Sequence, residues 1–257
     1  MRHDSSGSLV GWENTEREIG DDASRAGTAL DGALKRTLDI ILATTLLILL
    51  APVILIVAAM IRLDSSGPGF YRCPRIGQGG REFGMLKFRK MHDGARGPAL
   101  ASSDDERFTR LGPFLARTKL DELPQLWNVL RGQMSLVGPR PEDASFIELH
   151  AADFAVIHSV KPGMTGLCQL AFARESSVLD PNDRIGHYVH VILPQKVKID
   201  RLYASRRSIW MDIRILGWTV AAVLFGREVA VHRETGALSV RAPRTEPQEM
   251  AIGRAEA

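Results

Sequence analysis

The longest apolar run of the chain covers residues 40–61, IILATTLLILLAPVILIVAAMI, and contains no charged residue. A straight helix of that length spans roughly 30 Å, which is about one hydrocarbon core. Pro52 lies in the middle of the run, where it removes a backbone hydrogen bond and predicts a kink. Basic residues flank both ends, so the positive-inside rule gives no clear orientation. The pattern leaves two alternatives: a kinked span, or a re-entrant hairpin that leaves the membrane on the face it entered.

Shorter apolar patterns follow. Residues 70–76 and 82–88 alternate as strands and are separated by Gln78–Gly79–Gly80, which predicts a β-hairpin. Residues 183–206 predict a long amphipathic helix with a break at Pro194. Residues 212–225 form a short apolar segment that suits an interfacial helix on a membrane, with a buried core helix as the alternative. These patterns, with a helical stretch at 142–158, predict an α/β fold class, mostly helical, with a small β-hairpin.

Both ends of the chain lack apolar periodicity. Residues 1–33 are rich in Gly, Ser, Asp and Glu, and residues 233–257 are polar with scattered Pro, Arg and Glu. We expect disorder in both segments. The expected domains are therefore a membrane helix at 34–63 with a kink at Pro52 and a compact domain at 64–232.

The amino-acid composition excludes few classes of function. The net charge is +3 and the sequence pI is about 9.0, which fits binding to anionic lipid or phosphates. The sequence contains no recognisable nucleic-acid-binding module. Cys73 and Cys168 are isolated, so two free thiols in a reducing compartment are expected.

Residues 117–141, RTKLDELPQLWNVLRGQMSLVGPRP, carry the candidate chemistry. Asp121 and Glu122 are followed by Pro124 and an apolar run at helical spacing, which predicts a helix with Asp121 as its N-cap. Such an acidic pair is most often a solvated first turn. A carboxylate pair with basic residues around it also suits a phosphate-containing substrate and a divalent metal.

Basic residues cluster near this stretch. The predicted hairpin and its continuation to residue 90 form a basic platform for lipid phosphate or a sugar-nucleotide diphosphate, although a solvated surface is the simpler alternative. Arg140, between two prolines, is a pre-oriented guanidinium. Residues 161–166, KPGMTG, predict a tight turn that could present N–H groups to an anion.

Taken together, these motifs resemble the bacterial sugar transferases, the monotopic phosphoglycosyl transferases that start exopolysaccharide and other lipid-linked glycans. The resemblance covers about residues 34–226. It is carried by KRxxD (Lys35, Arg36, Asp39), the proline-broken apolar segment, LKFRxM, LDELPQL, SLVGPRPE and KPGMTG.

The resemblance implies a reaction and a topology. The family transfers a phospho-sugar from a nucleoside diphosphate sugar, with uridine expected, to polyprenol phosphate. It implies a re-entrant helix hinged at Ala51–Pro52 and a cytoplasmic catalytic domain at 64–232 on the cytoplasmic face of the inner membrane. Interfacial amphipathic helices are expected beside this domain from the apolar pattern. Anionic membrane lipid and downstream glycosyltransferases are candidate partners, and nucleic acid is not.

The resemblance also assigns roles. Asp121 is the expected nucleophile toward the β-phosphorus, and Glu122 is the expected ligand of Mg²⁺. The other candidate substrate-binding residues are Arg75, Lys87, Arg89, Arg117, Gln125, Arg140 and Lys161. Three positions depart from the family pattern: Ala51 replaces a frequent Ser before the hinge proline, Lys119 stands where Ser is common, and Lys90 replaces a small polar residue. The alternative function is a single-pass membrane adaptor whose cytoplasmic domain binds partners or anionic lipid.

Overall fold

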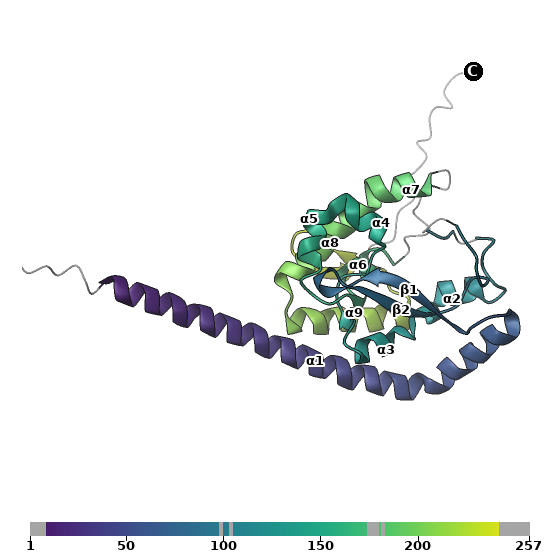
Figure 1. Cartoon of the computed structure of the whole chain (residues 1–257), viewed down its shortest axis with the longest axis horizontal. Helices are drawn as coiled ribbons and strands as arrows, with labels where there is room; N and C mark the ends of the chain where they lie inside the picture. Colours follow the sequence, from purple (N-terminus) through teal and green to yellow (C-terminus); the bar gives the residue numbers. More distant parts are fainter. Residues whose placement is uncertain (1–8, 98–99, 103–104, 174–179, 181–182, 242–257) are drawn as a thin grey trace, which may run out of the picture.

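The computed structural model describes residues 9–97, 100–102, 105–173, 180 and 183–241, with side chains from residue 30 onward (Figure 1). One long helix runs along a compact, mostly helical domain that contains three two-stranded sheets within the described residues. The predicted fold class, mostly helical with small sheets, is confirmed.

Helix α1 (Leu9–Asp64) contains the predicted apolar run and remains helical across Pro52. Figure 1 shows it bending in its second half, as expected where proline removes a backbone donor. Its segment Leu30–Asp64 is long and apolar enough to cross a membrane, judged by length and composition alone. The helix begins at Leu9, within the segment for which composition predicted disorder; alanines at 23, 26 and 29 are strong helix formers.

The KRxxD motif fastens α1 to the domain. Lys35 Nζ donates to Asp212 Oδ2 at 2.6 Å and to the Val137 carbonyl at 3.0 Å. Arg36 donates to the carbonyls of Val129 and Leu130, at 2.6 and 2.8 Å, at the C-terminal end of α3 (Gln125–Leu130). The buried Asp39 accepts from the Ser135 hydroxyl and the Leu136 backbone N–H of β3 (Ser135–Val137), at 3.1 and 3.0 Å.

The predicted hairpin is confirmed. Strands β1 (Phe70–Ile76) and β2 (Glu82–Phe88) pair antiparallel, joined through the short helix η1 (Gln78–Gly80). The alternate residues Phe83 and Met85 of β2 are buried in the main core. Asn128 of α3 makes two hydrogen bonds to the backbone of this strand: its side chain accepts from Leu86 N–H and donates to the Gly84 carbonyl, each at 2.9 Å. The hairpin and α3 are thereby held in one register.

Strands β3 and β4 (Gly163–Thr165) pair in parallel. The tight turn predicted at 161–166 was therefore wrong. Gly163 N–H donates to the Pro139 carbonyl at 2.8 Å, so this N–H is not available to an anion. Backbones approach closely here: a Cβ on Gly163 would lie 2.0 Å from Gly138 N, and one on Gly166 would lie 2.3 Å from Gly138 O. Only glycine fits at these positions, and we call the close contact of Gly138 with Gly163 and Gly166 the glycine seam.

Helices cover the rest of the domain. The elements are α2 (Gly112–Thr118), α4 (Ala144–Ile147), η3 (Glu148–His150), α5 (Ala151–Ile157), α6 (Leu167–Ala171), α7 (Arg184–His187), η5 (Tyr188–Ile192), α8 (Leu193–Arg206) and α9 (Ile209–Phe225). The helix predicted for 183–206 is interrupted by the π-helical η5, with Pro194 in the first turn of α8. Helix α9 buries Asp212 and Ile215 and exposes Trp210, Leu224 and Phe225.

The C-terminal region is partly ordered. Strand β6 (Leu238–Val240) pairs antiparallel with β5 (Val229–Val231), so disorder was wrongly predicted for this part of 233–257. The turn His232–Gly236 closes the hairpin, with Gly236 N–H donating to the His232 carbonyl at 2.8 Å. A polar composition hid a short hairpin whose strand β5 contributes the buried Val229 to the core. Residues 242–257 lie outside the described residues.

Candidate active site

The Asp121–Glu122 pair lies in a tight turn between two helices. After α2, Lys119 adopts a left-handed conformation, with φ of 58°, and leads into the 3₁₀ turn η2 (Leu120–Glu122). Helix α3 begins only at Gln125, with Pro124 as its N-cap, so the prediction of Asp121 as a helix N-cap was wrong. The proline fits the first turn, as expected, but the acidic pair precedes the helix instead of opening it.

Apolar neighbours bury this turn. Leu120 and Leu123, on either side of the acidic pair, pack against a cluster formed by Val57 and Ile61 of α1 with Phe88 and Leu115. Asp121 is consequently only 1% exposed. The turn thus lies against the part of α1 that follows Pro52.

Asp121 is held by Lys90, whose Nζ lies 2.9 Å from Asp121 Oδ2. Only 2% of the aspartate side chain is exposed, against 27% of the lysine side chain. Lys90 follows the end of β2, and its carbonyl accepts from Thr109 N–H at 3.1 Å. The exposed side of this ion pair is therefore the lysine side.

Glu122 is held by two further cations. Arg140 Nη2 lies 3.2 Å and Lys87 Nζ lies 3.6 Å from Glu122 Oε1. Burial by itself would raise the pKa of Glu122, but the charges of Arg140, Lys87 and Lys119 outweigh it and bring that pKa to about 2. Burial lowers the pKa of Lys87 from its usual value. Two adjacent carboxylates therefore face three cations: Lys87, Lys90 and Arg140.

The segment that carries Arg140 is built on the glycine seam. Pro139 accepts from Gly163, and Glu142, two residues beyond Arg140, accepts from Lys196 Nζ at 2.7 Å and from the Tyr188 hydroxyl at 2.9 Å. The buried Asp200 carboxyl also accepts from the Arg140 backbone N–H, and burial raises the pKa of Asp200 to about 8. A buried polar network thus fixes the backbone from which the guanidinium projects.

The other predicted residues lie apart from this pair or make different contacts. Arg75 pairs with Asp143 at 2.7 Å. Arg89 is buried and donates to the Pro68 and Ser65 carbonyls and to the Ser65 hydroxyl, so it secures the chain leaving α1. Arg117 is exposed near the end of α2, Gln125 is buried at the start of α3, and the pKa of Lys161 is lowered by burial and by Arg36. The structure brings only Lys87 and Arg140 of the predicted basic set onto the acidic pair.

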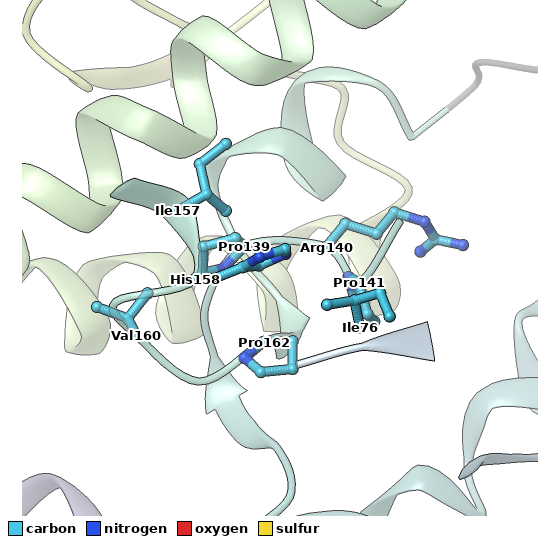
Figure 2. Close-up of a pocket in the computed structure, with 8 residues that line it drawn as sticks. All are labelled: Ile76, Pro139, Arg140, Pro141, Ile157, His158, Val160 and Pro162. Atoms are coloured by element: carbon cyan, nitrogen blue, oxygen red, sulfur yellow. The ribbon is translucent and has the colours of Figure 1, made fainter. Parts of the chain in front are cut away.

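Two cavities lie near these elements, and neither is lined by Asp121 or Glu122. The first is lined by Pro139, Arg140, Pro141, His158, Pro162 and three aliphatic residues, and its volume of about 10 Å³ has room for about one water (Figure 2). Figure 2 shows the Arg140 guanidinium extending away from the prolines. The second cavity, of about 280 Å³, lies between α1, β3 and α9 and is lined by Lys35, Leu42, Asp212, Leu216 and neighbours.

The acidic pair has the oxygen donors that Mg²⁺ prefers, and Mg²⁺ needs only one or two protein carboxylates when substrate phosphates supply the rest. Among the described residues, no group of three or more His, Cys, Asp or Glu side chains could hold a metal by itself. The three cations on the pair leave it with a net positive charge. The acidic pair therefore fits a metal only together with an anionic ligand that supplies further negative charge and oxygen donors.

Sequence reasoning missed the position of Lys90. The residue was visible only as a departure from the family pattern, and a lysine at the end of a basic strand resembles its neighbours. Its role as the partner of Asp121 depends on how β2 crosses the 119–124 turn, which no local pattern encodes.

An acidic pair surrounded by cations, next to a long apolar helix, defines a class of protein suited to phosphoryl transfer near a membrane. The family model for bacterial sugar transferases matches residues 30–226. The chain therefore belongs to the bacterial sugar transferase family, which confirms the resemblance and the transferase class.

Three curated relatives illustrate the family. A protein of Caulobacter vibrioides, named UDP-glucose:undecaprenyl-phosphate glucose-1-phosphate transferase, is 38% identical over 74% of this chain and 69% of its own length. A protein of the same name from Xanthomonas campestris pv. campestris is 41% identical over 74% of this chain and 38% of its own length. An Aeromonas hydrophila protein, named UDP-N-acetylgalactosamine-undecaprenyl-phosphate N-acetylgalactosaminephosphotransferase, is 33% identical over 75% of this chain and 44% of its own length. The chain thus spans less than half of the last two relatives.

Proposed function

We propose that this chain transfers a sugar 1-phosphate from a nucleoside diphosphate sugar to polyprenol phosphate, with Asp121 as a covalent nucleophile. The names of the relatives support a uridine nucleotide as donor and undecaprenyl phosphate as acceptor. They name two different sugars, so the sugar stays open. The observation that carries the proposal is the cluster itself: a buried carboxylate next to a second one, with three cations from β2, its continuation and the β3–α4 connection.

The reaction consists of two displacements. An Asp121 oxygen attacks the β-phosphorus, the bond from that phosphorus to the bridging oxygen breaks, and the nucleoside monophosphate leaves with the bridging oxygen. A phosphate oxygen of the polyprenol phosphate then attacks the same phosphorus, the acyl phosphate bond breaks, and Asp121 is restored as a carboxylate. The acceptor is already an oxyanion, so it needs little help from a general base.

The surrounding residues stabilise charge. Lys87 and Arg140 fix the ionised Glu122. The Arg140 side chain is also 34% exposed, so it can contact the diphosphate. When bound, Mg²⁺ would neutralise charge on the phosphate oxygens, with Glu122 as its protein ligand. The backbone under Arg140 is rigid because the glycine seam and the Glu142–Lys196 pair hold it.

We also propose that α1 enters and leaves the membrane on one face, hinged at Ala51–Pro52. Two sets of contacts support this path. Lys35, Arg36 and Asp39 bind the domain before the proline, and Val57 and Ile61 pack on it after the proline. A helix that crossed the bilayer would separate one of these sets from the domain by roughly 30 Å of hydrocarbon. The single-pass adaptor has no comparable support.

Covalent trapping tests the chemistry. Purified protein incubated with Mg²⁺ and UDP-sugar labelled in the sugar, without acceptor, should acquire one labelled sugar phosphate per chain. The adduct should map to Asp121 and disappear on addition of undecaprenyl phosphate. Asp121→Asn should abolish both adduct and turnover, whereas Asp153→Asn, which changes an aspartate paired with the exposed Arg201, should retain them. Turnover by Asp121→Asn, or an adduct on another residue, would contradict the proposal.

Cysteine accessibility tests the topology. In a Cys73→Ser background, Ser24→Cys precedes α1's apolar run, and Ser239→Cys lies on β6. Both should resist a membrane-impermeant maleimide in intact cells and react after permeabilisation. Labelling of Ser24→Cys alone in intact cells would favour the spanning adaptor.

A further inference from the structure

Lys90 covers the proposed nucleophile. Its Nζ is 2.9 Å from Asp121 Oδ2, and the carboxylate is almost completely buried behind it. A donor therefore has to approach Asp121 from the side on which Lys90 is exposed. The ion pair is an obstacle in the resting protein, because a carboxylate oxygen that accepts from an ammonium is a weaker nucleophile than a free one.

The backbone of Lys90 is fixed, so only its side chain can move. Its carbonyl accepts from Thr109 N–H, the next residue Met91 forms a β-bridge with Phe108, and Gly112 packs against it. The preceding Arg89 is buried and makes three hydrogen bonds to Ser65 and Pro68. A partly exposed lysine side chain on a fixed backbone can exchange partners without rearranging the site.

The charge balance of the first displacement calls for such an exchange. When an Asp121 oxygen bonds to phosphorus, the carboxylate loses its negative charge, and Lys90 loses its partner. The new phosphoryl group is attached to the same carboxyl, so its oxygens lie within reach of an ammonium that was 2.9 Å from Oδ2. A charge-assisted bond to a phosphoryl oxygen replaces the lost ion pair.

We propose that Lys90 is a catalytic residue that holds Asp121 in the resting enzyme and moves to the transferring phosphoryl group as the carboxylate attacks. The same contact stabilises the phosphoryl-aspartate until the acceptor arrives, and Lys90 returns to Asp121 after the second displacement. This inference rests on the proposed function, because it gives Lys90 a role in that reaction.

The test measures the rate of adduct formation in a single turnover. Lys90→Gln removes the charge at similar size, Lys90→Arg keeps the charge, and Arg110→Gln removes an exposed cation from the nearby loop as the matched control. Lys90→Gln should slow adduct formation about 10²-fold, as for loss of one donor to a transition-state oxyanion, with the donor KM changed less than about threefold. Lys90→Arg should recover part of the rate, and Arg110→Gln should react as the wild type.

A purely structural role predicts a different pattern. Misfolded Lys90→Gln would reduce the fraction of chains that form adduct while the remaining chains reacted at the normal rate, so amplitude and rate constant separate the two roles. The resting contact has its own readout, a double-mutant comparison. Lys90→Gln introduced into the wild type should lower the melting temperature more than Lys90→Gln introduced into Asp121→Asn, where the ion pair is already absent.

The outcomes are distinct. An adduct formed by Lys90→Gln at the wild-type rate would overturn the role of Lys90 and leave the proposed function standing, as would a loss of amplitude alone. Absence of any adduct in the wild type would reject the proposed function, and the role of Lys90 with it.

Discussion

Lys35 and Asp212, which are 177 positions apart in the sequence, meet at 2.6 Å and join the start of the apolar run to α9. Asp212 also accepts from the Tyr203 hydroxyl at 2.6 Å, so one buried carboxylate serves α1, α8 and α9. The KRxxD motif therefore sets where α1 lies on the domain. The lysine of the motif is a structural residue in this chain, although its basic character alone would suggest lipid phosphate.

Removing the lysine tests this assignment. Lys35→Met should destabilise the protein by about 3 kcal/mol, because it leaves the buried Asp212 charge without its cation. Thermal unfolding in detergent would measure the loss, and Lys198→Met, on an exposed position of α8, is the control. Equal melting temperatures for the two variants would mean that the contact contributes nothing to stability.

The glycine seam makes a second prediction. Gly163→Ala would place its Cβ within 2.0 Å of Gly138 N, so β3 and β4 would have to separate and Arg140 would lose its support. We expect loss of several kcal/mol of stability and reduced turnover in the surviving folded protein. Gly217→Ala is the matched control: nothing lies within 4 Å of its added Cβ, and a helix gains from alanine. An active and stable Gly163→Ala variant would show that the glycine seam does not require glycine at this position.

The β1–β2 hairpin was predicted correctly from sequence because its signal is local: alternating residues on both sides of a glycine-containing turn. The helix start at Asp121 was wrong because residue preferences for a cap compete with packing. Leu120 and Leu123 pack against the cluster that contains Val57 and Ile61, and with this packing the acidic pair lies before the helix starts.

Side-chain contacts between residues far apart in the sequence could not be predicted from local patterns. The family motifs named Arg75 and Arg89 beside Lys87, yet only Lys87 reaches the acidic pair. Arg75 pairs with Asp143, and Arg89 is buried against Ser65 and Pro68. Lys90 and Asp121, 31 positions apart, and Glu142 and Lys196, 54 positions apart, are brought together by the tertiary fold alone. The metal site at Glu122 stays a prediction.

The buried Asp200 predicts a dependence of stability on pH. Burial raises the pKa of Asp200 to about 8 in the folded protein, above its ordinary value of 3.8. The folded state therefore binds this proton more tightly than the unfolded state, so the contribution to stability is greatest below pH 3.8 and is lost as the pH rises to about 8. Asp200→Asn cannot ionise and should escape this loss.

The measurement is chemical unfolding of both proteins between pH 5 and pH 8.5. The stability of Asp200→Asn relative to wild type should rise across this range by on the order of 1–3 kcal/mol. Asp153→Asn, at a partly exposed position paired with Arg201, should show no such trend. A constant difference between Asp200→Asn and wild type would show that Asp200 is ionised throughout.

Metal binding should depend on the nucleotide. Lys87, Lys90 and Arg140 outnumber the two carboxylates, so free Mg²⁺ meets a positively charged site, whereas a diphosphate supplies the missing negative charge. Millimolar Mg²⁺ alone should leave the melting temperature unchanged within about 1 °C, and saturating UDP with Mg²⁺ should raise it by about 5 °C. Glu122→Gln should bind UDP with no further gain from Mg²⁺, while Asp143→Asn should behave as the wild type. Strong stabilisation by Mg²⁺ alone that persists in Glu122→Gln would place the metal on other residues.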